Sequence, residues 1–464
     1  MSLQNPLLLK KYFSSYWLRS AFYTISQRFS IALFGVINLM VLIRSLSKAQ
    51  MGVWAIFLVV TSIFETTKGG LLKNAHILYV SSSGADNPEK TAIASSSLLI
   101  NAAMTGFFII LIYTCGNLFG RWEGAGDELG LMLRWFIPGL LIMIFFSHLE
   151  AVQQSHLDFK GVFAGYFVRQ LAFLLVIVFH TLMHIPFSLE RLALYWSGCV
   201  ALGTIVIYFY SRKYLLNRFD PTLRWIKKIV GYGGYIFSSG IVANLFSNLD
   251  QLMTGSVIKS TADVASYNAA SRLNQFIDMP SYAAADVIFP KVSRASTEEG
   301  GNKVLYLYER MVAILMCFTV PVVLFIIIFA RLIITIIAGK AYLDAALILQ
   351  LYMIAGFLRP FQNQSANLLN SLGRARLCFI INAISLAANL VINYSCLHAI
   401  GFYGAAVGTV ITCLLGTVAW YIVMKRQVGV EMRSIIRYMG EFYKIFYRYG
   451  MELLDRARRV NPQL

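Results

Sequence analysis

Apolar residues in this chain fall into about a dozen blocks, and each block is long enough to cross a lipid bilayer. Hydrophobic residues make up 58% of the 464 residues and charged residues only 13%. A water-soluble protein of this size would need far more charge on its surface. The pattern therefore predicts an all-α polytopic membrane protein with twelve transmembrane helices and no room for a separate soluble catalytic domain.

A polar, basic loop near the middle of the chain divides the predicted spans six and six. We expect an N-terminal six-helix bundle over residues 1–211, a linker over 212–228, a C-terminal six-helix bundle over 229–425 and a basic amphipathic tail over 426–464. The predicted spans are 20–43, 53–78, 92–115, 129–151, 162–184, 189–211, 230–256, 264–288, 310–330, 344–370, 376–397 and 404–424.

The two halves share short patterns at similar positions. Residues 51–54 and 264–267 both read apolar, small, any residue, aromatic, at the start of the second helix of each bundle. Two related bundles with the substrate between them are a known plan for transporters. Chance similarity between hydrophobic segments is the alternative.

The residues that give the net charge of +18 are spread unevenly among the loops between the predicted spans. Lysine and arginine favour alternate loops, and the loops assigned to the inside hold about twice as many as the others. This predicts cytoplasmic termini and an even number of spans, and it accounts for the positive charge without a nucleic-acid partner. The tail after Arg426 has an apolar face and a basic face, so it either lies on an anionic leaflet or docks onto the protein's own loops.

Ionisable side chains within spans should face a cavity or a partner, because lipid does not solvate charge. Basic residues dominate this set: Arg28, Lys68, Arg272 and Arg359 against Glu65 and Asp250. We therefore expect a water-filled, cationic cavity in which the four basic residues bind an anionic substrate. Further polar residues predicted to line it are Asn248, Asn274, Gln275 and Asn363.

Several pairings stay open from the sequence alone. Glu65 and Lys68 are three residues apart and could neutralise each other on one helix face. Asp250 could pair with Arg272, which is the favoured interpretation, or could bind a proton or cation to drive transport. Arg134 and Arg169 lie about two turns from a helix end, where a long side chain could reach the interface instead of a cavity. Isolated polar residues could simply join helices by hydrogen bonds.

Motifs for enzyme chemistry are missing from the sequence. It contains no GxxxxGK[ST] phosphate loop, HExxH or GxSxG, so we predict no enzyme activity, no cofactor and no metal site. The six cysteines are scattered singly, and the six histidines near span ends are interpreted as satisfied interfacial residues.

Four segments give the chain a family resemblance: IRSLSKAQMGVW at 43–54, the stretch at 250–267, NSLGRAR at 370–376 and GFYGAAVGT at 401–409. Together with the span pattern, they resemble the polysaccharide-transporter branch of the multidrug/oligosaccharidyl-lipid/polysaccharide flippase superfamily. The first segment departs from the family pattern at Ile43 and at Gln50-Met51. The likeness covers about residues 15–425.

This resemblance implies a fold like that of the multidrug transporters of the superfamily and a location in the bacterial cytoplasmic (inner) membrane. It implies that the protein flips an undecaprenyl-diphosphate-linked oligosaccharide by alternating access, for O-antigen, capsule or exopolysaccharide synthesis. In related flippases, basic residues of the first and eighth spans serve the cavity, and Arg28 and Arg272 occupy those spans here.

Two other functions are kept as alternatives. A proton- or sodium-coupled drug antiporter shares the architecture, but its cavity should be acidic or aromatic. A membrane-embedded glycan polymerase would need long outer loops, whereas those predicted here are short. We expect a monomer whose partners are the lipid-linked anionic oligosaccharide and the lipid membrane, with a glycan polymerase or glycosyltransferases as candidate protein partners.

Overall fold

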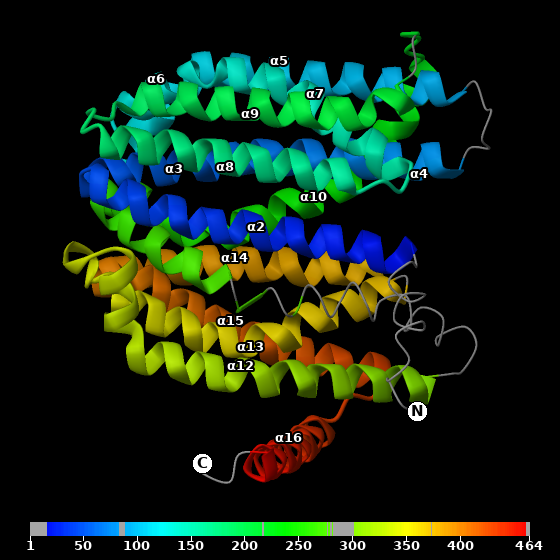
Figure 1. Cartoon of the computed structure of the whole chain (residues 1–464), viewed down its shortest axis with the longest axis vertical. Coiled ribbons are helices and arrows are strands. Elements are labelled where there is room, and N and C mark those ends of the chain that lie inside the picture. Colours follow the sequence, from blue (N-terminus) through cyan, green and yellow to red (C-terminus); the bar gives the residue numbers. More distant parts are fainter. Residues whose placement is uncertain are drawn as a thin grey trace. The chain divides into compact units, whose positions relative to one another are not determined.

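The computed structural model describes residues 16–82, 89–215, 218–275, 277–278, 281, 301–372 and 374–460. Every regular element in these ranges is a helix (Figure 1). The chain divides into two compact units, which we call the first unit (Met1–Arg272 with Thr335–Tyr342) and the second unit (Leu273–Ile334 with Leu343–Leu464).

Nine helical segments among the described residues are long and apolar enough to cross a membrane. One of them, Arg376–Val428, contains two helices in succession. The predicted span at 264–288 falls partly outside the described residues. An all-helical, multi-spanning architecture is therefore confirmed, while the number of twelve spans and the cytoplasmic termini stay predictions.

In the first unit, α8 packs between α2 and α9, α9 also packs against α7, and α10 packs against α3 and α5 (Figure 1). Residues 261–275 are also helical. The elements are α2 (Tyr16–Ser45), α3 (Lys48–Lys68), η1 (Gly69–Lys73), α4 (Asn74–Ser82), α5 (Glu89–Trp122), α6 (Glu128–Trp135), α7 (Ile137–Ser155), α8 (Lys160–Leu182), α9 (Leu189–Ser211), η2 (Arg212–Tyr214), α10 (Leu223–Met253), η3 (Thr254–Ile258) and η4 (Lys340–Tyr342).

The start of α3 shows why the motif around residue 50 has its sequence. Ser47 caps the helix by accepting from the Gln50 backbone N–H, and the Gln50 side chain accepts in return from the Ser47 backbone N–H. At Gly52, an added Cβ would overlap the Thr261 carbonyl. The glycine thus allows close contact between α3 and the start of the helix that begins at Thr261.

The second predicted span contains a local change of helix type. Between α3 and α4, residues 69–73 form the π-helix η1, which inserts a wider turn into an otherwise continuous helix. Such turns are rare and often occur at functional sites. Here Lys68 directly precedes η1 and Lys73 is its last residue, and both line one cavity.

The second unit contains α12 (Gly301–Ile337, whose last three residues belong to the first unit), α13 (Ala345–Ser371), α14 (Ala375–Ile400), η5 (Gly401–Tyr403), α15 (Gly404–Val428) and α16 (Met432–Val460). Its core joins residues of all five long helices, including Tyr308, Phe361, Trp420 and Ile435. In the second unit too, a glycine allows two helices to approach closely. A Cβ at Gly404, the first residue of α15, would overlap the Cys396 carbonyl of α14.

The amphipathic tail forms α16, which points in a different direction from α12 and α15 (Figure 1). Its first turns pack onto the other helices of the second unit. Ile435 is fully buried, and the Tyr443 hydroxyl donates to the Cys317 carbonyl of α12 at 3.0 Å. Docking onto the protein itself, one of the two predicted options, is therefore observed, although onto helix α12 and its neighbours instead of loops.

Candidate functional site

Two polar cavities lie side by side within the first unit, among helices that cross the membrane. Their volumes are about 240 and 220 Å³, and we call them the Lys68 cavity and the Arg272 cavity. Glu65 and Arg169 line both, and their side chains form an ion pair of 2.8 Å between Oε1 and Nη2. This ion pair is thus a wall shared by the two cavities.

The ion pair decides two questions that the sequence left open. Glu65 pairs with Arg169 of α8, whereas neutralisation by Lys68 on its own helix was one possibility. Arg169 does not extend to the interface, since it is buried with its guanidinium carbon 4.6 Å from the centroid of the Trp196 ring. Its position between a carboxylate and an aromatic face explains how an arginine is stable at this depth.

The Arg272 cavity is lined by α2, α3, α8 and the helix at 261–275. Asn38 and Asn268 supply further polar groups, and the Asn38 side-chain oxygen is buried without a hydrogen-bond partner among the described residues. Gly35 leaves space beside Arg272, since an added Cβ would lie 3.8 Å from Nη1. Arg272 therefore lines a polar cavity, and its role in binding an anion stays a prediction.

Arg28 lies on the same side of α2 as this cavity. Ile31, Gly35 and Asn38 line the cavity, and residue 28 precedes them at the spacing of one helix face. At about 1.5 Å per residue, Arg28 is about 4.5 Å farther along α2 than Ile31. Arg28 is exposed and does not itself line the three described cavities. Its place is beyond the end of the cavity wall.

The Lys68 cavity contains a second group of charges. Lys68 is only 2% exposed, and its Nζ has no hydrogen-bond partner within the part of the chain that the structure describes. On the opposite wall, Glu150 accepts from Lys73 at 2.7 Å and from the Tyr166 hydroxyl at 3.2 Å. An ammonium buried in this way is costly unless an anion or water approaches it.

Together the two cavities have an excess of positive charge. Lys68, Lys73, Arg169 and Arg272 line them, against the two carboxylates Glu65 and Glu150. Basic side chains therefore outnumber carboxylates in the lining of these two cavities. Lys73 and Glu150 were missed by the sequence argument, although both lie within predicted spans and ionisable residues in spans are the signal to look for.

Asparagines of α10 form hydrogen bonds within that helix and to a neighbouring helix. Asn244 donates to the Thr66 hydroxyl of α3 at 2.9 Å, and Asn248 donates back to Asn244 at 3.0 Å. Asn248 thus supports an interhelical hydrogen-bond network, which was the structural alternative. Asp250 is buried on the same helix. Its pairing with Arg272 and its role in ion coupling stay predictions.

Arg359 belongs to the second unit and has partners there. Its Nη1 donates to Asp278 at 2.9 Å, and, with the Asn274 amide turned so that its oxygen faces Arg359, that oxygen accepts at 2.7 and 2.9 Å. The sequence argument overlooked Asp278, which also lies within a predicted span. Gln275 is exposed and Asn363 is partly buried.

Comparison with known proteins decides the family. A sequence model of the family described as "Polysaccharide biosynthesis protein" matches residues 41–347. The chain belongs to the polysaccharide biosynthesis protein family. The family resemblance stated from the sequence is confirmed.

A curated relative of this family member is the probable low-salt glycan biosynthesis flippase Agl15 of Haloferax volcanii, 24% identical over 198 residues. That match covers 43% of this chain and 42% of Agl15, so the chain spans less than half the length of this relative.

Solved structures give the fold of this family member. It is similar to the lipid II flippase MurJ in an inward closed conformation, with a TM-score of 0.74, 14% identity and coverage of 94% of this chain and 93% of MurJ. It is also similar to an inward-facing multidrug resistance MATE family transporter, with a TM-score of 0.73, 15% identity and coverage of 87% and 98%. The expected MATE-like fold is therefore confirmed.

Proposed function

We propose that this protein flips a lipid-linked, anionic oligosaccharide across the bacterial cytoplasmic membrane by alternating access. The observation that carries this proposal is the excess of cations over carboxylates in the two cavities of the first unit. Guanidinium and ammonium groups at low dielectric bind a diphosphate strongly, because each contact is a charge-assisted hydrogen bond. Family membership supports a place in polysaccharide biosynthesis, and similarity to Agl15, a probable flippase, supports transport over catalysis.

Arg272 is the residue we assign to the diphosphate. It lies in a cavity where Asn38 has an unused acceptor, and Gly35 leaves room for a ligand beside the guanidinium. Arg28, on the same face of α2, would meet the anion first as it enters. Glu65, held by Arg169, would exchange partners when the anion neutralises that arginine.

The fold alone does not choose between cargoes, since a multidrug transporter shares it. A cationic drug would have to enter cavities in which positive charge is already in excess, which is unfavourable. The cavity charge therefore favours the lipid-linked anion over the antiporter alternative.

The test uses a strain that lacks this chain and is complemented with variants of it. Arg272→Ala combined with Arg28→Ala should reduce surface polysaccharide at least about tenfold and cause the lipid-linked precursor to accumulate. Arg272→Lys should retain part of the export, because it keeps the charge but loses the bidentate geometry. Protein abundance in the membrane is measured for each variant.

The matched control is Arg121→Ala. Arg121 is exposed and pairs with the exposed Asp127, so its loss should leave export unchanged. Normal export by the Arg28/Arg272 double variant at normal abundance would refute the assignment of the anion site.

A further inference from the structure

The largest described cavity lies apart from the two charged ones. Its volume is about 700 Å³, and it is lined by residues of α4, the start of α5, α7 and α9, together with Tyr214, Leu215, Arg218 and Phe219. It shares only His148 with the Lys68 cavity and no residue with the Arg272 cavity. The proposed transport reaction makes no use of it.

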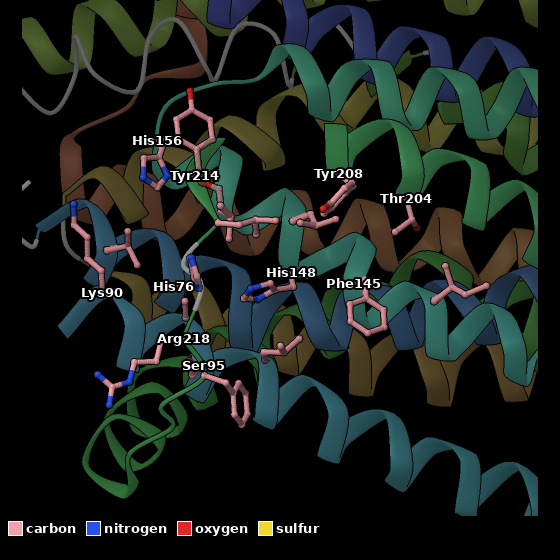
Figure 2. Close-up of a pocket in the computed structure, with 18 of the residues that line it drawn as sticks. His76, Lys90, Ser95, Phe145, His148, His156, Thr204, Tyr208, Tyr214 and Arg218 are labelled. Atoms are coloured by element: carbon pink, nitrogen blue, oxygen red, sulfur yellow. Dashed lines mark hydrogen bonds between the residues drawn. The ribbon is translucent and has the colours of Figure 1, made fainter. Parts of the chain in front are cut away.

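The lining changes in character from one end to the other. Figure 2 shows Lys90, Arg218, His76 and His156 gathered toward one end, whereas Phe145, Thr204 and Tyr208 lie toward the other. Most of the remaining lining is apolar: Val80, Ala94, Leu98, Ile142, Leu149, Val152, Ala201, Ile205, Leu215 and Phe219. A cavity with an apolar body and a cationic end matches an amphiphile with an anionic head.

Two buried imidazoles line this cavity without hydrogen bonds at one ring nitrogen each. His76 is 1% exposed, and neither its Nδ1 nor that of His148 has a partner among the described residues. The rings lie 5.7 Å apart, edge to face. The sequence predicted satisfied interfacial histidines, and these two nitrogens have no protein partner among the described residues. Buried polar atoms of this kind need a water, an ion or a ligand as partner.

His156 is fixed at the basic end. Its ring stacks on Tyr214 with centroids 4.3 Å apart, and Nδ1 lies 2.9 Å from the Val152 carbonyl. If Nδ1 carries the proton toward that carbonyl, the other ring nitrogen accepts; if both are protonated, it donates to an anion. Arg218, nearby in the same lining, is exposed and belongs to the connector between α9 and α10.

The apolar part opens toward lipid. Phe145 and Ile205 line the cavity and are 56% and 51% exposed, and they belong to two membrane-spanning helices, α7 and α9. An exposed apolar residue on such a helix contacts acyl chains. The charge pattern of the loops predicts that the basic end, which includes the 212–228 region, faces the cytoplasm.

We propose that this cavity binds an anionic phospholipid of the cytoplasmic leaflet, with its phosphate near Lys90, Arg218 and His156 and one acyl chain along Phe145 and Ile205. The connector contributes to the same site. Ser95, a lining residue, accepts from the Asp220 backbone N–H at 3.0 Å, and Ser96 accepts from that of Thr222 at 3.1 Å. A bound lipid would therefore hold the α9–α10 connector against α5.

The experiment measures lipid binding to the purified full-length chain in detergent, by native mass spectrometry and thermal shift. The probes are phosphatidylglycerol, phosphatidylcholine, glycerol 1-phosphate and undecaprenyl diphosphate. We expect phosphatidylglycerol to bind several-fold more tightly than phosphatidylcholine, and glycerol 1-phosphate to bind negligibly because it lacks the chains.

Two variants test the two halves of the site. Lys90→Gln with Arg218→Gln should weaken phosphatidylglycerol binding about tenfold. Ala201→Phe, which fills the apolar part, should weaken it similarly without changing charge. The matched control is Arg212→Gln with Lys227→Gln, which removes two exposed charges from the same region but outside the lining. It should retain the wild-type affinity.

Three results would overturn the proposal. Equal weakening in the control would indicate only diffuse attraction to a basic surface. Equal binding of glycerol 1-phosphate would indicate a site for soluble phosphate. Displacement of phosphatidylglycerol by lower concentrations of undecaprenyl diphosphate would assign the cavity to the transported lipid. None of these readouts depends on flipping activity, so failure here and failure of the proposed function are distinguishable.

Discussion

Among single residues, Glu123 is a carboxyl group in an unusual environment outside the membrane-spanning segments. It follows α5, is fully buried, and neither carboxyl oxygen has a hydrogen-bond partner among the described residues. Burial raises the pKa of Glu123 to about 8, with Lys259 acting in the opposite direction. Lys259 contacts the same turn, since its Nζ donates to the Trp122 carbonyl. A proton on Glu123 therefore favours the packing of this turn onto η3.

The sign of the resulting pH dependence follows from the two states. The folded protein holds the Glu123 proton up to a pKa of about 8, whereas the unfolded chain releases it near the ordinary value of 4.5. The unfolding free energy should therefore fall as pH rises between these values, by on the order of a few kcal/mol in total. Glu123→Gln should remove this slope in thermal melts from pH 5 to 9, while the exposed Glu128→Gln should keep it. Identical slopes for wild type and Glu123→Gln would contradict the buried-acid interpretation.

Gly52 gives a second prediction at this scale. Because a Cβ would overlap the Thr261 carbonyl, Gly52→Ala should lower the unfolding free energy by about 2 kcal/mol or more. The matched control is Gly106→Ala in α5, where nothing lies within 4 Å of the added Cβ. That change should be neutral or slightly stabilising, since alanine favours helix. The measurement is the melting temperature in one detergent, and equal shifts for both variants would rule out the proposed close contact.

The charges of the site divide into those a sequence can identify and those it cannot. Arg272 and Lys68 were identifiable, because charge inside an apolar span requires a cavity or partner. Their partners were not, since Glu65 meets Arg169 across 104 positions and Arg359 meets Asp278 across 81. Spacing along one helix reports only neighbours on that helix, so pairing across helices needs the packing itself.

At the level of elements, hydropathy located the helices but not their ends or breaks. The blocks predicted at 92–115 and 310–330 lie inside longer helices, α5 and α12, because polar residues extend a helix beyond the lipid. The block at 129–151 is divided after Trp135, and the new helix begins at Ile137 with Pro138 in its first turn. The π-helix η1 has no hydropathy signature, because a wider turn changes hydrogen bonding and not composition.

Helix α16 gives a prediction at this scale, since its two adjacent isoleucines have opposite environments. Ile435 is fully buried against the second unit, whereas Ile436 is 61% exposed. Ile435→Asp should lower the free energy of docking α16 by about 3 kcal/mol and release the helix, because an unpaired charge cannot stay in that core. Ile436→Asp should leave it docked. Hydrogen exchange over 432–446 reports the result, and equal protection in the two variants would show that α16 is held elsewhere.

For the whole molecule, one experiment can test both the predicted orientation in the membrane and the number of crossings between two exposed residues. Asp127 and Arg212 are both exposed, and three segments able to span a membrane lie between them: Ile137–Ser155, Lys160–Leu182 and Leu189–Tyr214, the last of which contains Arg212 at its end. An odd number of crossings places the two residues on opposite sides. The charge pattern assigns Asp127 to the outside and Arg212 to the cytoplasm.

Cysteine labelling of the full chain in intact cells measures this arrangement. A membrane-impermeant maleimide should label Asp127→Cys at once and Arg212→Cys only after permeabilisation, with the unsubstituted chain reporting background from the exposed Cys115. Loss of the exposed Asp127–Arg121 ion pair in this variant should change the unfolding free energy little. Reversed labelling would invert the topology and move the basic end of the large cavity to the outer leaflet. Labelling of both residues from one side would mean that one of the three helices does not cross, although each is apolar enough to do so.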